Sequence, residues 1–312
     1  MTAERSTSLP IYLAARRGEI DSALARYLPA SPDAPAVVAV AMRYSLLAGG
    51  KRFRPILTLA AADAVGAEMG RSLALPAACA IEMIHTYSLI HDDLPAMDDD
   101  TLRRGRPTLH VIAGDGMAIL AGDGLQAEAF SLLAREPVTD DAAINARKLR
   151  VIRLIADAAG PAGMVGGQAI DLEAVRPGPG NHAAPLDGAA VETMHARKTG
   201  ALIRASAVSG AVIAGADDRV IAAIDRYAAH VGLAFQIVDD ILDVAAESAA
   251  LGKTAGKDAA AGKPTYPALF GLDRSRALAA ACLADAEQAL GDVGLSESHL
   301  AGIARWIVAR QS

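Results

Sequence analysis

The stretch LIHDDLPAMDDDTLRRGRP, residues 89–107, places five aspartates within nine residues and follows them with three arginines. Two carboxylates about 4 Å apart repel by roughly 4 kcal/mol at an effective dielectric of about 20, so water or a cation must offset the repulsion. Carboxylates without neighbouring His or Cys ligands are hard oxygen donors that suit Mg²⁺, Mn²⁺ or Ca²⁺. The stretch therefore predicts a site for a hard divalent cation.

A second acidic cluster lies in QIVDDILD, residues 236–243. Helical spacing puts its polar side chains within an arc of about 100°, opposite the apolar ones. Those polar residues are Gln236, Asp239, Asp240 and Asp243. Alone, the segment is equally a solvated acidic face. Because Mg²⁺ is held by one or two carboxylates plus substrate phosphates, two such clusters predict a pair that faces across a helical bundle and binds a diphosphate.

Proline should end the helix that carries the first cluster. Pro95 has no N–H and clashes with the preceding turn, so the helix is expected to end close to Asp93. Asp92 and Asp93 would then close the helix, and Asp98 would return towards them from the loop.

Basic residues supply complementary charge for phosphates. Singly, each is typical of a solvated surface cation; together they suffice for two phosphate-bearing substrates. The set, with one hydroxyl residue, is Lys51, Arg54, Arg103, Arg104, Lys198, Thr199 and Lys253. His85 lies seven residues before Asp92 and shares its helical stripe, although a core histidine is the alternative.

Several familiar chemistries have no motif here. The chain lacks a Walker loop and GxGxxG, which argues against a nucleotide as the phosphate carrier. It also lacks a GxSxG elbow, a Cys–His signature and HExxH. Electrostatic and metal catalysis is the chemistry that remains.

Composition indicates an all-α scaffold. Of 312 residues, 52% are hydrophobic and only 4% aromatic, so the core must be built from small and aliphatic side chains. Apolar residues recur at helical spacing over several long segments, and no convincing linker divides them. We expect one domain, residues 1–312, forming a helical bundle of about ten helices around a central cavity. The helical segments are 36–48, 76–93, 115–134, 143–171, 188–213 and 218–245.

The net charge and the number of cysteines restrict the possible binding partners and cellular location of the protein. A net charge of −6 argues against nucleic acid or an anionic membrane as the main partner. We find neither a secretory signal nor an uncharged run long enough for a membrane span, so we expect a cytoplasmic protein. Cys79 and Cys282 each lack a CxxC partner and are expected to be buried small hydrophobes.

Taken in order, these motifs resemble the trans-isoprenyl diphosphate synthases, and most closely the bacterial farnesyl diphosphate synthases. The resemblance runs from about residue 36 to 271. It is carried by GGKRFRP, IHTYSLIHDDLPAMDDDTLRRGRPTLH, GGQAIDL, KTGALIRA, FQIVDDILDV and GKPTYPALFGL.

The resemblance implies an isoprenoid synthase fold, usually a homodimer, with three Mg²⁺ ions per active site that Mn²⁺ can replace. It implies metal ligands at Asp92, Asp93, Asp98, Asp239 and Asp243, with Asp240 in the second motif. It places Arg103, Lys198, Thr199, Gln236 and Lys253 on the allylic diphosphate. It places Lys51, Arg54, His85 and Arg104 on isopentenyl diphosphate, and Gln168 and Asp171 near the pocket in an open role.

The implied reaction is a head-to-tail condensation with dimethylallyl or geranyl diphosphate. Metal and cations assist ionisation to an allylic cation, which the isopentenyl double bond attacks. Tyr87 and Ser88, one turn before Asp92, are the candidate chain-length residues. A bulky tyrosine at this position is similar to the pattern in enzymes that make the fifteen-carbon product. The alternative is that Tyr87 is a core aromatic residue.

Other readings remain. They are a geranylgeranyl diphosphate synthase, a terpene cyclase, which would lack a second substrate site, and a non-catalytic subunit, which would be expected to lose an acidic motif. Both motifs are retained here. Arg310 is the only late cation in the tail WIVARQS, so we do not expect the C-terminus to act as a lid.

Overall fold

The described chain is helical almost throughout. A computed structural model describes residues 8–175, 188–249 and 265–310. Within these residues the only sheet is a pair of two-residue strands, so the all-α prediction is confirmed. By its contacts the chain groups into two compact units: unit 1 contains Met1–Ile155 and Ser209–Ala216, and unit 2 contains Ala156–Val208 and Asp217–Ser312. That the whole chain acts as one domain stays a prediction.

Unit 1 contains the first acidic motif. Its elements are α1 (Leu9–Tyr27), α2 (Ala36–Leu46), α3 (Phe53–Asp92), β1 (Leu102–Arg103), β2 (Arg106–Pro107), α4 (Leu109–Ala113), α5 (Asp115–Arg135) and most of α6 (Ala142–Ala159). The two strands pair antiparallel, with Leu102 opposite Pro107.

Helix α3 is two helical segments that fold back on one another at Ala67. This residue has φ 49° and ψ −142°, which no helix accommodates. Two ion pairs join the segments at equal sequence distances from the bend. Asp63 pairs with Arg71, four residues either side of Ala67, and Arg52 pairs with Glu82, fifteen residues either side. The fold-back brings the GGKRFRP motif beside the helix that ends in the first acidic motif.

Small side chains form much of the core of unit 1. Helix α3 buries a run of alanines and aliphatic residues, and α5 packs against it with Leu125 and Leu132 fully buried. Cys79 is also fully buried in this layer, as expected. Alanine suits the arrangement because it lets helices approach closely at no cost in side-chain entropy.

One helix of unit 1 is long and apolar enough to cross a membrane by length and composition. It is α3, and 72% of its most apolar window is buried inside the protein. Because the helix also bends back at Ala67, we interpret it as a core helix and not as a span.

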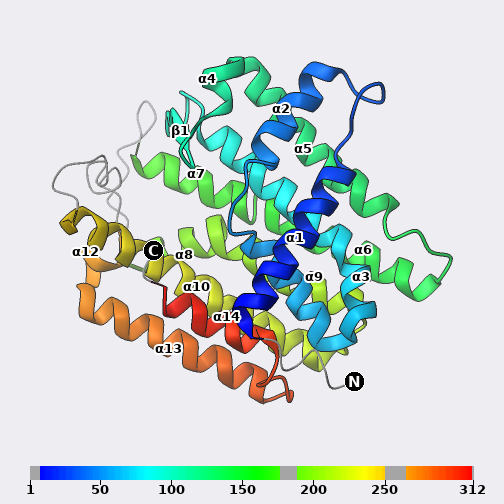
Figure 1. Ribbon diagram of the computed structural model, residues 1–312. Coiled ribbons are helices and arrows are strands. Elements are labelled where there is room, and N and C mark those ends of the chain that lie inside the picture. The colour runs from blue at the N-terminus through cyan, green and yellow to red at the C-terminus, as the bar shows by residue number, and fades with distance from the viewer. Residues whose placement is uncertain (1–7, 176–187, 250–264, 311–312) are drawn as a thin grey trace. The chain divides into compact units, whose positions relative to one another are not determined.

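Unit 2 contains the second acidic motif. Its elements are α7 (Met164–Val175), α8 (Gly188–His195), the π-turn η2 (Ala196–Gly200), the first half of α9 (Ala201–Ala214), α10 (Asp218–Ala249), α12 (Tyr266–Phe270), α13 (Leu272–Gly291) and α14 (His299–Val308). Figure 1 shows α10, α13 and α14 running side by side. The buried Tyr227 hydroxyl donates to the Leu300 carbonyl oxygen at 2.7 Å and joins α10 to α14. Cys282 is buried on α13.

Two predicted helices are interrupted. The segment 143–171 is not continuous, because α6 ends at Ala159 and α7 begins at Met164. Gly160 and Pro161 explain the break, since glycine favours a helix end and proline cannot donate the next helical hydrogen bond. The segment 188–213 contains η2, a turn type that recurs at functional sites.

Candidate active site

The first acidic motif folds as the sequence predicts. Helix α3 ends at Asp92, and the following loop turns back on it. The Asp98 amide donates to the Asp92 carbonyl oxygen at 2.9 Å, and the Asp100 amide donates to that of Asp93 at 3.2 Å. Asp98 therefore returns to the end of the helix, where Asp92 is half-buried and Asp98 is exposed.

Asp93 is held by Arg103. Its Oδ1 accepts from Nε at 2.7 Å and from Nη2 at 2.5 Å, and only 4% of the residue is exposed. Burial raises the pKa of Asp93, and the Arg103 guanidinium opposes that rise. Of the three predicted ligands in this motif, Asp92 and Asp98 are thus the more accessible to a cation, and Arg103 is oriented by Asp93.

The predicted isopentenyl diphosphate residues gather in the same unit. Lys51 is exposed just before α3, and Arg54 lies on its first turn. Arg54 Nη1 lies 3.3 Å from His85 Nε2. Burial, reinforced by the charge of Arg54, lowers the pKa of His85 well below its usual range, so this imidazole is neutral and its Nε2 accepts. Arg104 Nη1 donates to the Gly49 carbonyl oxygen and completes a cationic group.

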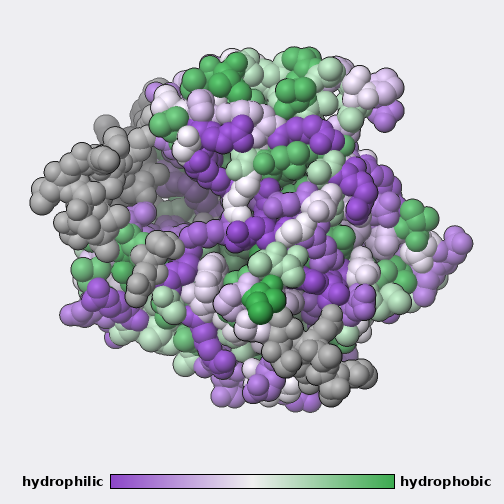
Figure 2. Space-filling model, in the orientation of Figure 1, coloured by the Kyte–Doolittle hydropathy of each residue, from purple (hydrophilic) through white to green (hydrophobic). Residues whose placement is uncertain are grey.

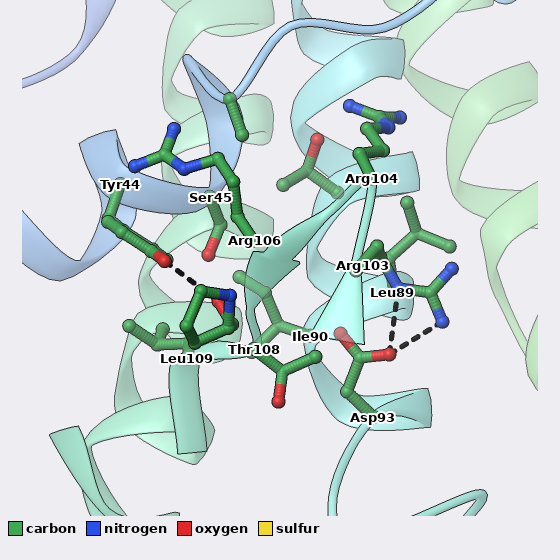
Figure 3. A pocket seen from close by; sticks show the side chains of 13 residues that line it. Tyr44, Ser45, Leu89, Ile90, Asp93, Arg103, Arg104, Arg106, Thr108 and Leu109 are labelled. Atoms are coloured by element: carbon green, nitrogen blue, oxygen red, sulfur yellow. Dashed lines mark hydrogen bonds and ion pairs between the residues drawn. The ribbon is translucent and has the colours of Figure 1, made fainter. Parts of the chain in front are cut away.

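A small pocket lies beside these residues. Figure 3 shows Asp93, Arg103, Arg104, Arg106 and Tyr44 around it, and its volume is about 40 Å³. The Tyr44 hydroxyl donates to the Pro107 carbonyl oxygen at 2.7 Å, while the Arg106 guanidinium stacks 4.5 Å from the Tyr44 ring centre. Both contacts hold the β1–β2 hairpin on α2 and so fix Arg103 and Arg104.

The chain-length candidates lie one turn before Asp92 on α3. Tyr87 is 6% exposed, and its ring lies 5.7 Å from that of His91 in an edge-on arrangement. Burial and the charge of Asp92 raise the pKa of Tyr87, which keeps the phenol neutral. The Ser88 hydroxyl donates to the His85 carbonyl oxygen.

In unit 2, Lys198 is paired with Asp171. The Nζ and Oδ2 atoms are 2.5 Å apart, and Asp171 is almost completely buried. The pair depends on close packing of α7 against η2: a Cβ at Gly167 would lie 2.2 Å from the Lys198 amide nitrogen. This explains the glycine before Gln168 in GGQAIDL and gives Asp171 a role in orienting Lys198; Gln168 lies half-buried on α7.

Thr199, Gln236 and Asp240 form a chain of hydrogen bonds. The Thr199 hydroxyl donates to Gln236 Oε1 at 3.3 Å, and Gln236 Nε2 donates to Asp240 Oδ1 at 2.8 Å. The Tyr266 amide donates to Asp240 Oδ2 at 2.9 Å. Burial raises the pKa of Asp240 to about 6 despite these donors. Both oxygens of Asp240 are engaged, so it is suited to positioning and less suited to binding a metal.

Asp239 is in contact with the C-terminal segment. Arg310 Nη2 lies 2.6 Å from Asp239 Oδ1; the arginine side chain is 4% exposed and that of the aspartate 39%. The guanidinium also lies 4.4 Å from the Phe235 ring centre. We did not expect the C-terminus to act as a lid, and the structure shows that its one late cation contacts the second acidic motif. Asp243 is exposed one turn further along α10.

Sequence reasoning missed several residues of these networks, and one predicted residue cannot be placed. Lys253 lies outside the described residues. The missed residues are Arg52, Glu82 and Tyr266, and Arg310 was named without its contact to Asp239. Arg52 had a signal, since it sits between two predicted binding residues; the others are joined to the site only by the fold.

The donor set suits a hard cation bound together with substrate. Within the described ranges, no group of three His, Cys, Asp or Glu side chains is assembled to hold a metal. Carboxylates at Asp92, Asp98, Asp239 and Asp243 are oxygen donors of the kind Mg²⁺ uses when waters and phosphates complete its shell. The residues therefore fit such an ion.

The all-helical fold, the acidic motifs, the oriented cations and the neutral histidine are features expected of the isoprenoid synthase class. Comparison with known proteins identifies the family. The model of the polyprenyl synthetase family matches residues 35–293. A farnesyl diphosphate synthase from Geobacillus stearothermophilus is 44% identical over 97% of this chain and 98% of its own length. A chloroplastic geranylgeranyl pyrophosphate synthase 7 from Arabidopsis thaliana is 47% identical over 89% of this chain and 78% of its own. The crystal structure of an FPP/GFPP synthase from Zymomonas mobilis superposes with a TM-score of 0.83 at 38% identity, covering 96% of this chain and 99% of that one.

The chain therefore belongs to the polyprenyl synthetase family. The resemblance read from the motifs and the fold class are confirmed. Members of this family are metal-dependent enzymes that act on isoprenoid diphosphates.

Proposed function

We propose that the protein is a farnesyl diphosphate synthase that condenses isopentenyl diphosphate with dimethylallyl or geranyl diphosphate. One observation carries the proposal: unit 1 alone holds both an acidic motif for a metal-bound diphosphate and a separate cationic group. That group contains Lys51, Arg54 and Arg104, with the neutral His85 in contact with Arg54. A second cationic group is what a second diphosphate requires.

Asp92 and Asp98 in unit 1, and Asp239 and Asp243 in unit 2, would supply oxygen ligands to Mg²⁺, and the family resemblance implies three such ions per active site. When bound, the ions neutralise the charge that develops on the leaving diphosphate. Within unit 1 Asp93 orients Arg103, and within unit 2 Asp171 orients Lys198, so each cation is preoriented to bind a phosphate.

The reaction then proceeds in three bond changes. The allylic C–O bond breaks and leaves an allylic cation; the isopentenyl double bond attacks it and forms the new C–C bond. A proton leaves the resulting cation, and the released pyrophosphate accepts it. His85 is neutral because of burial and Arg54, and it therefore orients Arg54 without adding a charge to that diphosphate site.

Tyr87 limits the product to fifteen carbons. Its buried ring lies on α3 five residues, about 7.5 Å along the helix, before Asp92, and we infer that the growing chain descends towards it. The geranylgeranyl alternative is retained because a chloroplastic geranylgeranyl pyrophosphate synthase is also among the relatives.

The test is turnover by the purified chain with labelled isopentenyl diphosphate, geranyl diphosphate and Mg²⁺, with product length read by chromatography. We expect a fifteen-carbon product. A twenty-carbon product would support the alternative, and no turnover would support a non-catalytic subunit. Asp92→Ala and Asp239→Ala should each lower the rate by about 10² or more without unfolding the protein.

We further propose a cytoplasmic homodimer. Exposed apolar side chains lie on α2, α4 and α5, which are mutually packed helices of unit 1. Figure 2 shows hydrophobic surface at the top of the view, where Figure 1 labels α2 and α4. The exposed apolar residues are Val37, Val40, Val111, Ile112, Ile119 and Leu120. A second copy of the chain is the proposed cover, and light scattering at micromolar concentration tests it, with a mass of one chain as the contrary result.

A further inference from the structure

Arg52 is the most enclosed cation of the GGKRFRP motif. Only 1% of its side chain is exposed, and it donates three hydrogen bonds of 2.8 Å. The acceptors are Asp21 Oδ1 on α1, the Leu46 carbonyl oxygen at the end of α2, and Glu82 Oε1 on α3. Arginine suits this position because its planar fork carries donors in fixed directions. A single side chain thus ties three helices together.

The backbone at Arg52 is as constrained as its side chain. Its φ of 50° and ψ of 37° are left-handed, which L-residues rarely adopt. The residue also precedes the first turn of α3 directly, between Lys51 and Arg54. Such a conformation persists where surrounding contacts over-determine it. Here the three hydrogen bonds of the side chain are those contacts.

The partner of Arg52 lies beside the partner of Arg54. Glu82 is three residues before His85 on the second segment of α3, a separation of about 5 Å along the helix. The Arg52–Glu82 pair therefore joins the same two segments that the Arg54–His85 contact joins, one turn away. Without it, the segment with Lys51 and Arg54 is no longer fixed against His85.

We propose that Arg52 is a positioning residue for the isopentenyl diphosphate site: it holds Lys51 and Arg54 in register with His85 without touching substrate. This inference rests on the proposed function, because it assigns the cationic group to the second diphosphate. The buried pair Arg52–Glu82 then determines how Lys51 and Arg54 are positioned in that site.

Two variants test the proposal. Arg52→Met removes the guanidinium, and the double variant Arg52→Met, Glu82→Leu also removes the carboxylate that would otherwise be left buried and unpaired. We expect either change to raise KM for isopentenyl diphosphate about tenfold and to leave KM for geranyl diphosphate within about twofold. Calorimetric titration with isopentenyl diphosphate alone should show the same weakening, and thermal denaturation reports the folded fraction.

Arg71→Met is the matched control. Arg71 is also a buried arginine of α3, paired with Asp63 at 2.7 Å, but it lies roughly 20 Å along the helix from His85. Its loss should lower thermal stability and leave both KM values unchanged.

Three outcomes would overturn the proposal. One is a folded Arg52 variant with unaltered KM for isopentenyl diphosphate, and another is an equal rise in both KM values. The third is failure of both Arg52 variants to fold while Arg71→Met folds, which would make Arg52 a folding residue only. Failure of the proposed function is distinguishable: the wild-type protein would not consume isopentenyl diphosphate, whereas Lys51→Ala should weaken its binding even if Arg52 variants do not.

Discussion

His195 predicts a measurable dependence of stability on pH. It is the last residue of α8, its ring lies 5.8 Å from that of Tyr266, and its buried Nδ1 has no hydrogen-bond partner among the described groups. Burial lowers its pKa from 6.5 to about 4, although the nearby Asp171 carboxylate opposes the change. The folded protein therefore keeps this imidazole neutral where the unfolded chain would protonate it.

The sign and size of the pH dependence of stability follow from this difference in the pKa of His195 between the folded and unfolded states. As pH falls below 6.5, the unfolded state binds a proton that the folded state does not, so stability is lost until the pH reaches about 4. Each pH unit in this window removes about 1.4 kcal/mol, and a change from pH 6.5 to pH 5 removes about 2 kcal/mol. At pH 8, well above the unfolded-state pKa, both states are neutral at this residue and the contribution is constant.

Urea denaturation at pH 8 and pH 5 measures the effect, with His195→Phe as the control. Phenylalanine retains the ring contact with Tyr266 but cannot titrate, so all other groups contribute equally to both proteins. The wild-type protein should lose about 2 kcal/mol more than His195→Phe between these two pH values. Equal losses would show that His195 titrates normally in the folded protein and would refute the reasoning.

Three further changes have defined outcomes. Asp240→Asn replaces one carboxylate oxygen by an NH2 group, which then faces the N–H donor of Gln236 or Tyr266. The free energy of unfolding of the metal-free protein should fall by about 1–3 kcal/mol in thermal denaturation, and an unchanged melting temperature would contradict this. Arg310→Gln removes a competitor for Asp239, so the Mn²⁺ concentration for half-saturation, followed by electron paramagnetic resonance, should fall by up to about fivefold; a rise would contradict the competition. Tyr87→Ala should lengthen the product by at least one isoprene unit in the labelled assay, and an unchanged fifteen-carbon product would remove Tyr87 as the limit.

The sequence was most informative where local chemistry decides the structure. Pro95 predicted the end of α3, and the loop returns Asp98 to Asp92 as expected, because proline and closely spaced backbone groups act over a few residues. The helical face with Asp239 and Asp243 likewise follows from spacing alone.

Features that depend on tertiary contacts were not predictable. Ala67 bends α3 directly after Gly66, but a glycine inside an apolar helical pattern does not by itself predict that the chain folds back at the next residue. In the sequence, Arg52 has the features of a solvated surface cation. Its partner Glu82 is thirty residues further along the chain and contacts it only in the folded protein. Asp240 is paired with the amide of Tyr266, which is 26 residues away. Such partners are chosen by packing, which one sequence does not display.

Pyrophosphate release is the most direct test of condensation as the central claim. The purified protein should release pyrophosphate from geranyl diphosphate and Mg²⁺ only when isopentenyl diphosphate is present, with one farnesyl diphosphate formed for each pyrophosphate. Release from geranyl diphosphate alone at a comparable rate would contradict the account, because it would indicate an enzyme that ionises the allylic substrate without a second one.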